Sequence, residues 1–371
     1  MNKLRIGVLY GGRSGEHEVS LQSARSVMSA LDRSRYEIVE IGITLQGQWL
    51  VGDGVMEALE SKSGRGRCAA VFAEPGPCNV WEVQAGKSEG EKCLRLFRQV
   101  DVMFPVLHGT FGEDGTLQGL LEMAEIPYVG AGVLASSVAM DKALFKNLMR
   151  AHGVPVLEYL LCGRGEIAHE LEDVIRRAET MAPYPLFTKP SNLGSSVGIS
   201  RCNNRSDLVE GLADAARFDR RVLIERGIDA REIEISVLGN EKMEASIPGE
   251  VIPSREFYSY ESKYVDGTSR LLIPAPIPPE KTADVKRLAM EAYRAIDGAG
   301  LGRVDFLMER TTGDLFLSEI NTMPGFTSIS MYPKLWEASG LSYAALLDRL
   351  LQLALERHEE RVHSERIYRA N

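Results

Sequence analysis

Cysteine is scarce in this sequence of 371 residues. Five cysteines are present, at positions 68, 78, 93, 162 and 202, and none of them forms a C-x-x-C pair. An odd number of widely spaced cysteines fits reduced thiols better than a disulfide scaffold or a zinc site. The pattern therefore predicts a cytoplasmic protein without structural disulfides.

Long apolar runs and an excess of basic charge are also missing. The longest stretch without a charged residue, Ile126 to Met140, contains proline and glycine and is shorter than the ~20 apolar residues that cross a bilayer. The formal net charge is −9, which disfavours general binding to nucleic acid or to an anionic membrane. Any anionic ligand must be held by a few local cations and by backbone N–H groups.

The remaining composition is that of a globular α/β protein. A hydrophobic fraction of 44% and a length of 371 residues predict two or three domains. The first unit begins with a strand, a glycine turn, a helix and a second strand, which is typical of a parallel layer. We predict its strands at residues 4–9, 37–43 and 100–107, and an irregular insertion or weak hairpin at residues 60–92. Later strands are predicted at residues 154–161, 185–189, 221–225, 231–238, 304–309 and 315–320.

Two glycine-rich turns follow strands of the first unit. Gly11–Glu16 reads GGRSGE, and a tight βα turn explains it as well as an anion site does. Glu16 would instead attract a cation, such as the ammonium group of a substrate. His108–Gly115 reads HGTFGEDG, and it is either a ligand-binding loop after a strand or a solvated turn that caps the next helix.

A third loop, Thr188–Gly198, reads TKPSNLGSSVG between two predicted strands. Small residues let the backbone approach phosphates, and Lys189 supplies positive charge. The G-x-x-x-x-G-K-[ST] order of a P-loop is absent. The segment is either a glycine lid over a ligand or an ordinary hairpin turn.

The most informative pattern joins two neighbouring strands near the C-terminus. Residues two apart on a strand point to the same face, so Arg303 lies beside Asp305, and Glu319 beside Asn321. A polar turn at residues 310–314 makes the two strands antiparallel neighbours. Carboxylate and amide oxygens that converge in this way suit Mg²⁺. A salt-bridged surface hairpin is the alternative, and the apolar flanking residues disfavour it.

Two further segments could close such a site. Residues 321–330 follow directly, with Gly325 for close backbone approach and Ser330 at the start of a helix, where an anion could bind. Phe257–Tyr264 is aromatic yet interrupted by charge, which indicates a long loop, either exposed or folded over a site.

Taken together, these motifs resemble the D-alanine–D-alanine ligase family of the ATP-grasp superfamily. The matching segments are residues 11–20, 108–119, 140–142, 189–198, 257–264, 302–305 and 319–330. They occur in the family's order over nearly the whole chain, apart from about residues 60–92. The resemblance implies an ATP-grasp fold preceded by a parallel, Rossmann-like α/β domain. It also implies ATP-dependent joining of two D-alanines through an acyl phosphate, in peptidoglycan precursor synthesis.

The resemblance also implies residue roles. Glu16 holds the ammonium of the first D-alanine, His108 borders this substrate, and Ser195 and Tyr264 link to Glu16 when the loops close. Arg303 and the N–H of Gly325 stabilise the tetrahedral oxyanion. The second carboxylate is received by Ser330 and Met331, with Arg303. Two Mg²⁺ ions, or Mn²⁺ in their place, are bound by Asp305, Glu319 and Asn321. ATP is held by Lys142, Lys189, Glu225, Ile228, Glu232 and Lys263.

The implied organisation is an N-terminal substrate domain (1–129), a central ATP-grasp subdomain (130–225) and a C-terminal subdomain with the metal site (226–371). The implied partners are D-alanine, ATP and a second copy of the chain in a homodimer. Two alternatives stay open: a relative that makes a D-alanine–D-lactate ester, and a catalytically silent nucleotide-binding regulator. The silent regulator would be expected to lack Arg303 or the metal-binding trio, and all are present.

Overall fold

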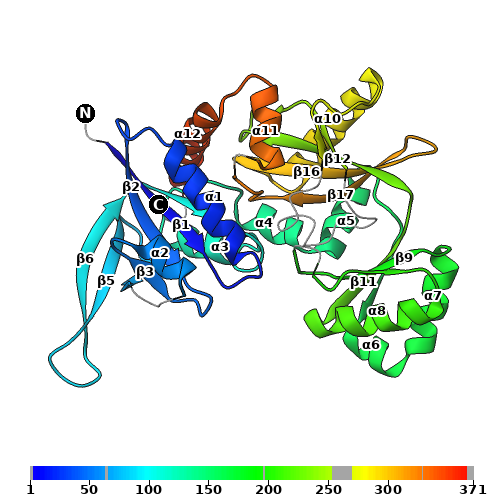
Figure 1. Ribbon diagram of the computed structural model, residues 1–371, viewed down its shortest axis with the longest axis horizontal. Helices are drawn as coiled ribbons and strands as arrows, with labels where there is room; N and C mark the ends of the chain where they lie inside the picture. The colour runs from blue at the N-terminus through cyan, green and yellow to red at the C-terminus, as the bar shows by residue number, and fades with distance from the viewer. Residues whose placement is uncertain (1–2, 63–65, 195–196, 253–269, 328, 366–371) are drawn as a thin grey trace, which may run out of the picture.

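Three β-sheets, each with its own helices, make up the structure (Figure 1), which is a computed structural model. It describes residues 3–62, 66–194, 197–252, 270–327 and 329–365. The three sheets come from successive parts of the sequence, in agreement with the predicted mixed α/β architecture.

The first sheet has seven strands in the order β6-β5-β4-β3-β2-β1-β7. Only β2, β1 and β7 run parallel, and β3 to β6 extend the sheet in antiparallel fashion. The parallel core is therefore as predicted. Of the two alternatives for residues 60–92, an irregular insertion or a weak hairpin, the antiparallel pairing of β4 with β5 favours the hairpin. The strands are β1 (Leu4–Gly11), β2 (Tyr36–Ile43), β3 (Trp49–Val51), β4 (Arg67–Ala70), β5 (Cys78–Ala85), β6 (Lys92–Val100) and β7 (Val102–Val106).

Three helices accompany the first sheet: α1 (His17–Ala30), α2 (Val55–Glu60) and α3 (Thr116–Met123). Helix α4 (Val133–Met140) follows, and its Ala135 and Ala139 lie in the core of the third sheet. The C-terminal helix α12 (Tyr343–Val362) also packs here, and its leucines share one buried core with α1, β1 and β7. The end of the chain thus returns to the N-terminal sheet, next to α1 in Figure 1.

The second sheet is antiparallel, with the order β10-β9-β11-β8. Its strands are β8 (Tyr159–Gly163), β9 (Leu186–Pro190), β10 (Ser200–Cys202) and β11 (Arg221–Arg226). Its helices are α6 (Arg164–His169), α7 (Leu171–Met181) and α8 (Arg205–Phe218), and they share its core. Helix α5 (Lys142–Ala151) precedes them.

The predicted strand at residues 154–161 is wrong in its first half. Val154, Val156 and Leu157 are buried, but they lie in an extended link whose Pro155 carbonyl accepts a hydrogen bond from Leu317. Val154 and Val156 pack into the core of the third sheet, and only the residues from Tyr159 onward form the strand β8.

The third sheet follows the order β15-β14-β12-β16-β17, and β13 pairs with β12. Its strands are β12 (Ala230–Leu238), β13 (Glu244–Ala245), β14 (Gly249–Ile252), β15 (Arg270–Leu272), β16 (Leu301–Glu309) and β17 (Leu315–Asn321). Helix α10 (Pro279–Ala295) covers one face with Val285, Leu288 and Ala292, and α11 (Met331–Ala338) follows β17. No helix in the described ranges is long and apolar enough to cross a membrane.

Candidate active site

The face of the third sheet that α10 leaves uncovered is polar. Strand β12 places Glu234 opposite Asp305 of β16, and Asp305 lies opposite Glu319 of β17. Two residues earlier on β16, and so on the same face, Arg303 lies opposite Asn321. The other face of the same strands carries Ile233, Ile235, Val304, Phe306 and Ile320 in the core. The sequence pattern therefore predicted this convergence correctly, but it missed Glu234.

Arg303 connects the acidic groups of this face. Its Nε and Nη2 donate to the two carboxylate oxygens of Asp305 at 2.8 and 2.7 Å, and its Nε also lies 2.9 Å from Glu234. The Asn321 amide donates to Asp305 at 3.0 Å. Glu234 is only 5% exposed, so the guanidinium offsets buried negative charge as well as facing the open side of the sheet.

The donor chemistry of this face fits Mg²⁺. Asp305 and Glu319 supply two carboxylates on facing strands, and Asn321 adds an amide. Mg²⁺ is commonly bound by one or two carboxylates, with substrate phosphates and waters as its other ligands. Within the described residues, no three His, Cys, Asp or Glu side chains form a complete metal cage, which excludes an all-protein site of that kind there.

The loop after β17 continues directly from the strand that carries Glu319 and Asn321. A Cβ atom at Gly325 would lie 2.9 Å from Ser330 Oγ, so a larger residue would push this hydroxyl away. Ser330 Oγ also accepts from the Thr327 amide at 3.1 Å and precedes α11, whose first residue, Met331, is buried. Ser330 thus opens a helix, as the sequence predicted, and its hydroxyl lies beside Gly325.

Three distant segments meet around Glu16, which lies just before α1 and is 7% exposed. Gly109 has φ +71°, and a Cβ there would collide with the Glu16 carboxylate. A Cβ at Gly194, in the predicted lid, would lie 3.4 Å from the same carboxylate. Gly109 and Gly194, from two distant glycine-rich segments, therefore approach one another beside Glu16, which favours binding loops over isolated turns.

His108 links the first sheet to the loop after β17. Its Nδ1 lies 2.9 Å from the Met323 carbonyl oxygen, and its Nε2 lies 3.2 Å from Ser23 Oγ. Burial lowers the pKa of His108, so the ring is neutral near pH 7. Because a carbonyl oxygen only accepts, Nδ1 carries the proton. His108 thus borders the Glu16 region with both ring nitrogens engaged inside the protein.

Glu113 connects the same two segments, and the sequence analysis assigned it no role. Its carboxylate accepts from the Gly109 amide at 2.7 Å and from the Met323 amide at 3.0 Å. Burial, reinforced by the neighbouring Glu16 carboxylate, raises the pKa of Glu113 to about 8. The alternation of polar residues and glycines in HGTFGEDG was the only signal for it.

Replacing Glu113 with glutamine should change how stability depends on pH. Between pH 4.5 and about 8 the unfolded chain has lost the Glu113 proton while the folded chain retains it, so the free energy of unfolding falls as pH rises. This group contributes a slope of up to about 1.4 kcal/mol per pH unit. Urea unfolding of both proteins at several pH values in this window should show a shallower decline for Glu113→Gln. Parallel curves would contradict the assignment.

Lys142 is the first residue of α5, and its side chain contacts the glycine-rich loop after β9. Its Nζ donates to the Leu193 carbonyl oxygen at 2.5 Å. The preceding Asp141 caps the helix by accepting from the Ala143 and Leu144 amides, and it is also paired with Arg221 of β11. This explains the M-D-K motif: the aspartate fixes the helix start, and the lysine then points at the loop.

Lys189 and Glu225 lie on the neighbouring strands β9 and β11. Lys189 Nζ is 2.5 Å from Glu225 Oε2, and the other oxygen of Glu225 is paired with Lys146 of α5. Each carboxylate oxygen of Glu225 is therefore paired with a different lysine. Ile228 is half-buried in the link to β12, and Glu232 shares a strand face with Glu234. Three other predicted residues, Ser195, Lys263 and Tyr264, lie outside the described residues, as does all of Phe257–Tyr264.

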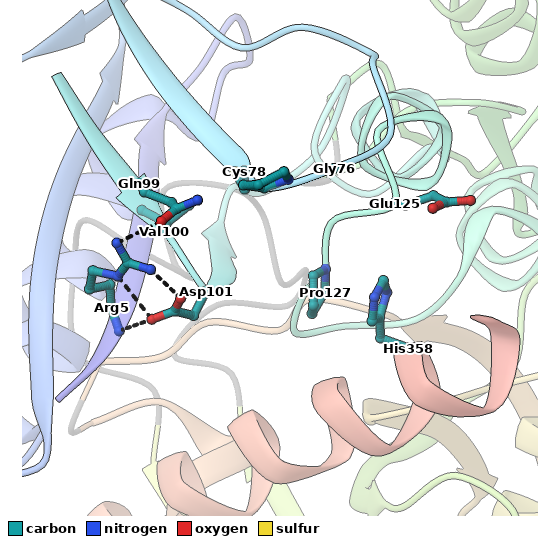
Figure 2. A pocket seen from close by; sticks show the side chains of 10 residues that line it. Arg5, Gly76, Cys78, Gln99, Val100, Asp101, Glu125, Pro127 and His358 are labelled. Carbon is teal, nitrogen blue, oxygen red and sulfur yellow. Dashed lines mark hydrogen bonds and ion pairs between the residues drawn. The ribbon is translucent and has the colours of Figure 1, made fainter. Parts of the chain in front are cut away.

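A separate cavity of about 280 Å³ opens on the N-terminal domain, away from these residues (Figure 2). Figure 2 shows Arg5 bonded to Gln99 and Asp101 at its edge, with His358 of α12 at the opposite side. The Arg5 guanidinium and the Asp101 carboxylate form an ion pair with an N–O distance of 2.6 Å. Arg303, Asp305, Glu319 and Asn321 are not among the residues that line this cavity.

Two protein-family models match the chain. The model described as "D-ala D-ala ligase N-terminus" matches residues 5–131, and the model described as "D-ala D-ala ligase C-terminus" matches residues 148–352. Among the curated relatives, a D-alanine–D-alanine ligase of a Thermoanaerobacter species is 51% identical over 97% of this chain and 99% of its own length. The corresponding ligase of Heliobacterium modesticaldum is 50% identical over 97% of each chain.

Solved structures agree in fold. The D-alanine–D-alanine ligase of Coxiella burnetii has a TM-score of 0.81 at 35% identity, covering 98% of this chain and 97% of its own. The VanG D-Ala:D-Ser ligase of Enterococcus faecalis has a TM-score of 0.79 at 32% identity, covering 95% of this chain and 100% of its own. The name of the second protein gives D-serine in place of the second D-alanine. Similarity of fold alone therefore does not show which amino acid a ligase of this fold uses as its second substrate.

Proposed function

The chain belongs to the D-alanine–D-alanine ligase family and is an ATP-dependent ligase that joins two D-alanines for peptidoglycan synthesis, and we propose that the residues described above carry this reaction. One observation supports the assignment most strongly: Arg303, Asp305, Glu319 and Asn321 share the open face of the third sheet. In this proposal, the carboxylate of the first D-alanine attacks the γ-phosphorus of ATP and releases ADP. The amine of the second D-alanine then attacks the acyl phosphate, a peptide bond forms, and phosphate leaves.

The first D-alanine binds at Glu16. A nearly buried carboxylate approached by Gly109 and Gly194 can pair with the ammonium group of a small amino acid. The His108 and Glu113 bonds to Met323 hold the glycine loop at a fixed distance from the loop after β17. Ser195 and Tyr264 complete the enclosure, which keeps water from the acyl phosphate.

ATP lies between the second and third sheets. Lys142 and Lys189 bind its phosphates, with Lys263. The backbone of Glu225–Ile228 faces adenine, and Glu232 binds the ribose. The metal ligands are Asp305, Glu319 and Asn321, which would hold two Mg²⁺ ions, with Mn²⁺ as an alternative. When bound, the metal offsets negative charge where phosphate and carboxylate meet.

Arg303 and the Gly325 N–H stabilise the oxyanion that forms when the amine attacks. Asp305 and Glu234 already hold the Arg303 guanidinium in place, so this group needs little reorganisation at the moment of reaction. Ser330 and Met331, at the start of α11, receive the second carboxylate together with Arg303.

We further propose that the protein is a cytoplasmic homodimer. Each chain would have three domains, with boundaries near residues 129 and 225. The three sheets lie within these three ranges, which supports the division, although α12 packs back on the first sheet. The net charge of −9 supports small-molecule partners rather than nucleic acid or membrane.

A competition assay tests the acceptor assignment. With ATP, D-alanine as donor and equal concentrations of D-alanine, D-serine and D-lactate as acceptors, mass spectrometry should find D-alanyl-D-alanine as the main product. L-alanine alone should not stimulate phosphate release. A D-serine dipeptide or a D-lactate ester as the main product would assign the chain to another branch of the superfamily.

A further inference from the structure

A buried carboxylate shared by two lysines lies beneath the phosphate-binding side of the central subdomain. Glu225 is 2% exposed, and its two oxygens are bound to different cations, Lys189 and Lys146. Lys146 itself is 3% exposed, whereas the Lys189 side chain is 16% exposed. Only Lys189 is therefore placed both to touch Glu225 and to reach a ligand.

The cluster holds two positive charges and one negative charge. Although burial opposes it, the two lysines lower the pKa of Glu225 to about 2, so the carboxylate is ionised at neutral pH. Burial lowers the pKa of Lys146, against the attraction of Glu225. Burying the Lys146 ammonium costs free energy, which its pairing with Glu225 offsets. The presence of this second lysine beside Glu225 needs an explanation.

Anchoring α5 does not supply this explanation. The helix is already fixed to the second sheet by the Asp141–Arg221 pair, and its Phe145 and Met149 lie in the core of the third sheet. Neutralising Glu225 does not supply it either, because Lys189 alone already pairs with this carboxylate.

We propose that Lys146 is a positioning residue for ATP: it occupies one oxygen of Glu225, so that Lys189 keeps positive charge for the phosphates. This inference rests on the proposed role of Lys189. Without Lys146, Glu225 and Lys189 form a neutral pair, and the polyphosphate meets no net charge from this cluster. With Lys146, one unit of positive charge remains, and it resides on the exposed partner.

Titration calorimetry with ADP and with adenosine, each in the presence of Mg²⁺, tests the proposal. Only ADP carries phosphates, so an effect on the phosphates changes the affinity for ADP and not the affinity for adenosine. Lys146→Met should weaken ADP binding about tenfold, which is about 1.4 kcal/mol, and leave adenosine binding nearly unchanged. Lys189→Met should show the same selectivity with a larger loss, because it removes the contacting cation. The double variant Lys146→Met/Glu225→Gln again holds one net positive charge, so its ratio of ADP to adenosine affinity should return toward that of the native chain.

The outcomes are distinct. Equal losses of ADP and adenosine binding in Lys146→Met, with Lys189→Met still selective, would mean that Lys146 only shapes the pocket, and would overturn the inference alone. If Lys189→Met shows no selectivity, the assignment of Lys189 fails, and the inference fails with it. Should circular dichroism show that Lys146→Met does not fold, the double variant decides: a folded double variant without preference for ADP contradicts the proposal.

Discussion

Replacing Arg303 with alanine is expected to lower kcat by about 10²-fold or more, with a smaller increase in KM for D-alanine. The tetrahedral oxyanion carries charge that neither substrate carries at that atom, so its partner acts mainly on the transition state. The two N–H groups that Arg303 donates to Asp305, at 2.8 and 2.7 Å, show a guanidinium already fixed on the open face of the sheet. Steady-state kinetics with purified variants would measure both constants.

The same substitution removes a partner from the buried Glu234 carboxylate, so fold and turnover must be separated. Breaking such a pair costs about 3–5 kcal/mol in the free energy of unfolding. Arg303→Lys keeps the charge but not the paired N–H donors, and should lose less turnover. Arg310→Ala, at the exposed end of the same hairpin, should retain normal kinetics. A folded Arg303→Ala enzyme with native kcat and only a raised KM would contradict the oxyanion role.

Replacing Glu319 with glutamine should lower turnover by at least about 10²-fold at ordinary Mg²⁺ concentrations, because a neutral amide is a weaker ligand for a hard cation than a carboxylate. Glu319 lies directly opposite Asp305, the other predicted carboxylate ligand. The activity should respond to Mg²⁺ at higher concentrations than in the native enzyme. Initial rates over a Mg²⁺ titration at fixed ATP would show this shift.

Glu309→Gln provides the matched control, since Glu309 lies at the far end of β16, beside the turn, and accepts from Thr312. Its rate and Mg²⁺ dependence should be native. If Glu319→Gln turned over normally at the same Mg²⁺ concentration as the native chain, Glu319 would not be a metal ligand.

The sequence predicted those parts of the site that depend on local periodicity. Alternation on β16 and β17 placed Arg303, Asp305, Glu319 and Asn321 on one face, and the polar turn between the strands fixed their pairing. The resemblance to the ligase family, carried by motifs in fixed order, is confirmed by the family models and the relatives.

Contacts between distant segments could not be predicted in this way. Glu113 and Met323 are far apart in the chain, and their hydrogen bond depends on how the first sheet meets the loop after β17. Lys146 looks like one more charged residue on an amphipathic helix until Glu225 is placed beside it. Val154 and Val156 alternate like strand residues, yet they are buried in a link between sheets.

Isotope transfer during turnover tests the central claim most directly. With D-alanine labelled by ¹⁸O in its carboxylate, the first D-alanine should give one of its labelled oxygens to the released phosphate through the acyl phosphate. We expect ADP, D-alanyl-D-alanine and phosphate in equal amounts, with one ¹⁸O atom in each phosphate. Dipeptide formed with unlabelled phosphate, or with AMP and pyrophosphate as the products of ATP, would contradict it.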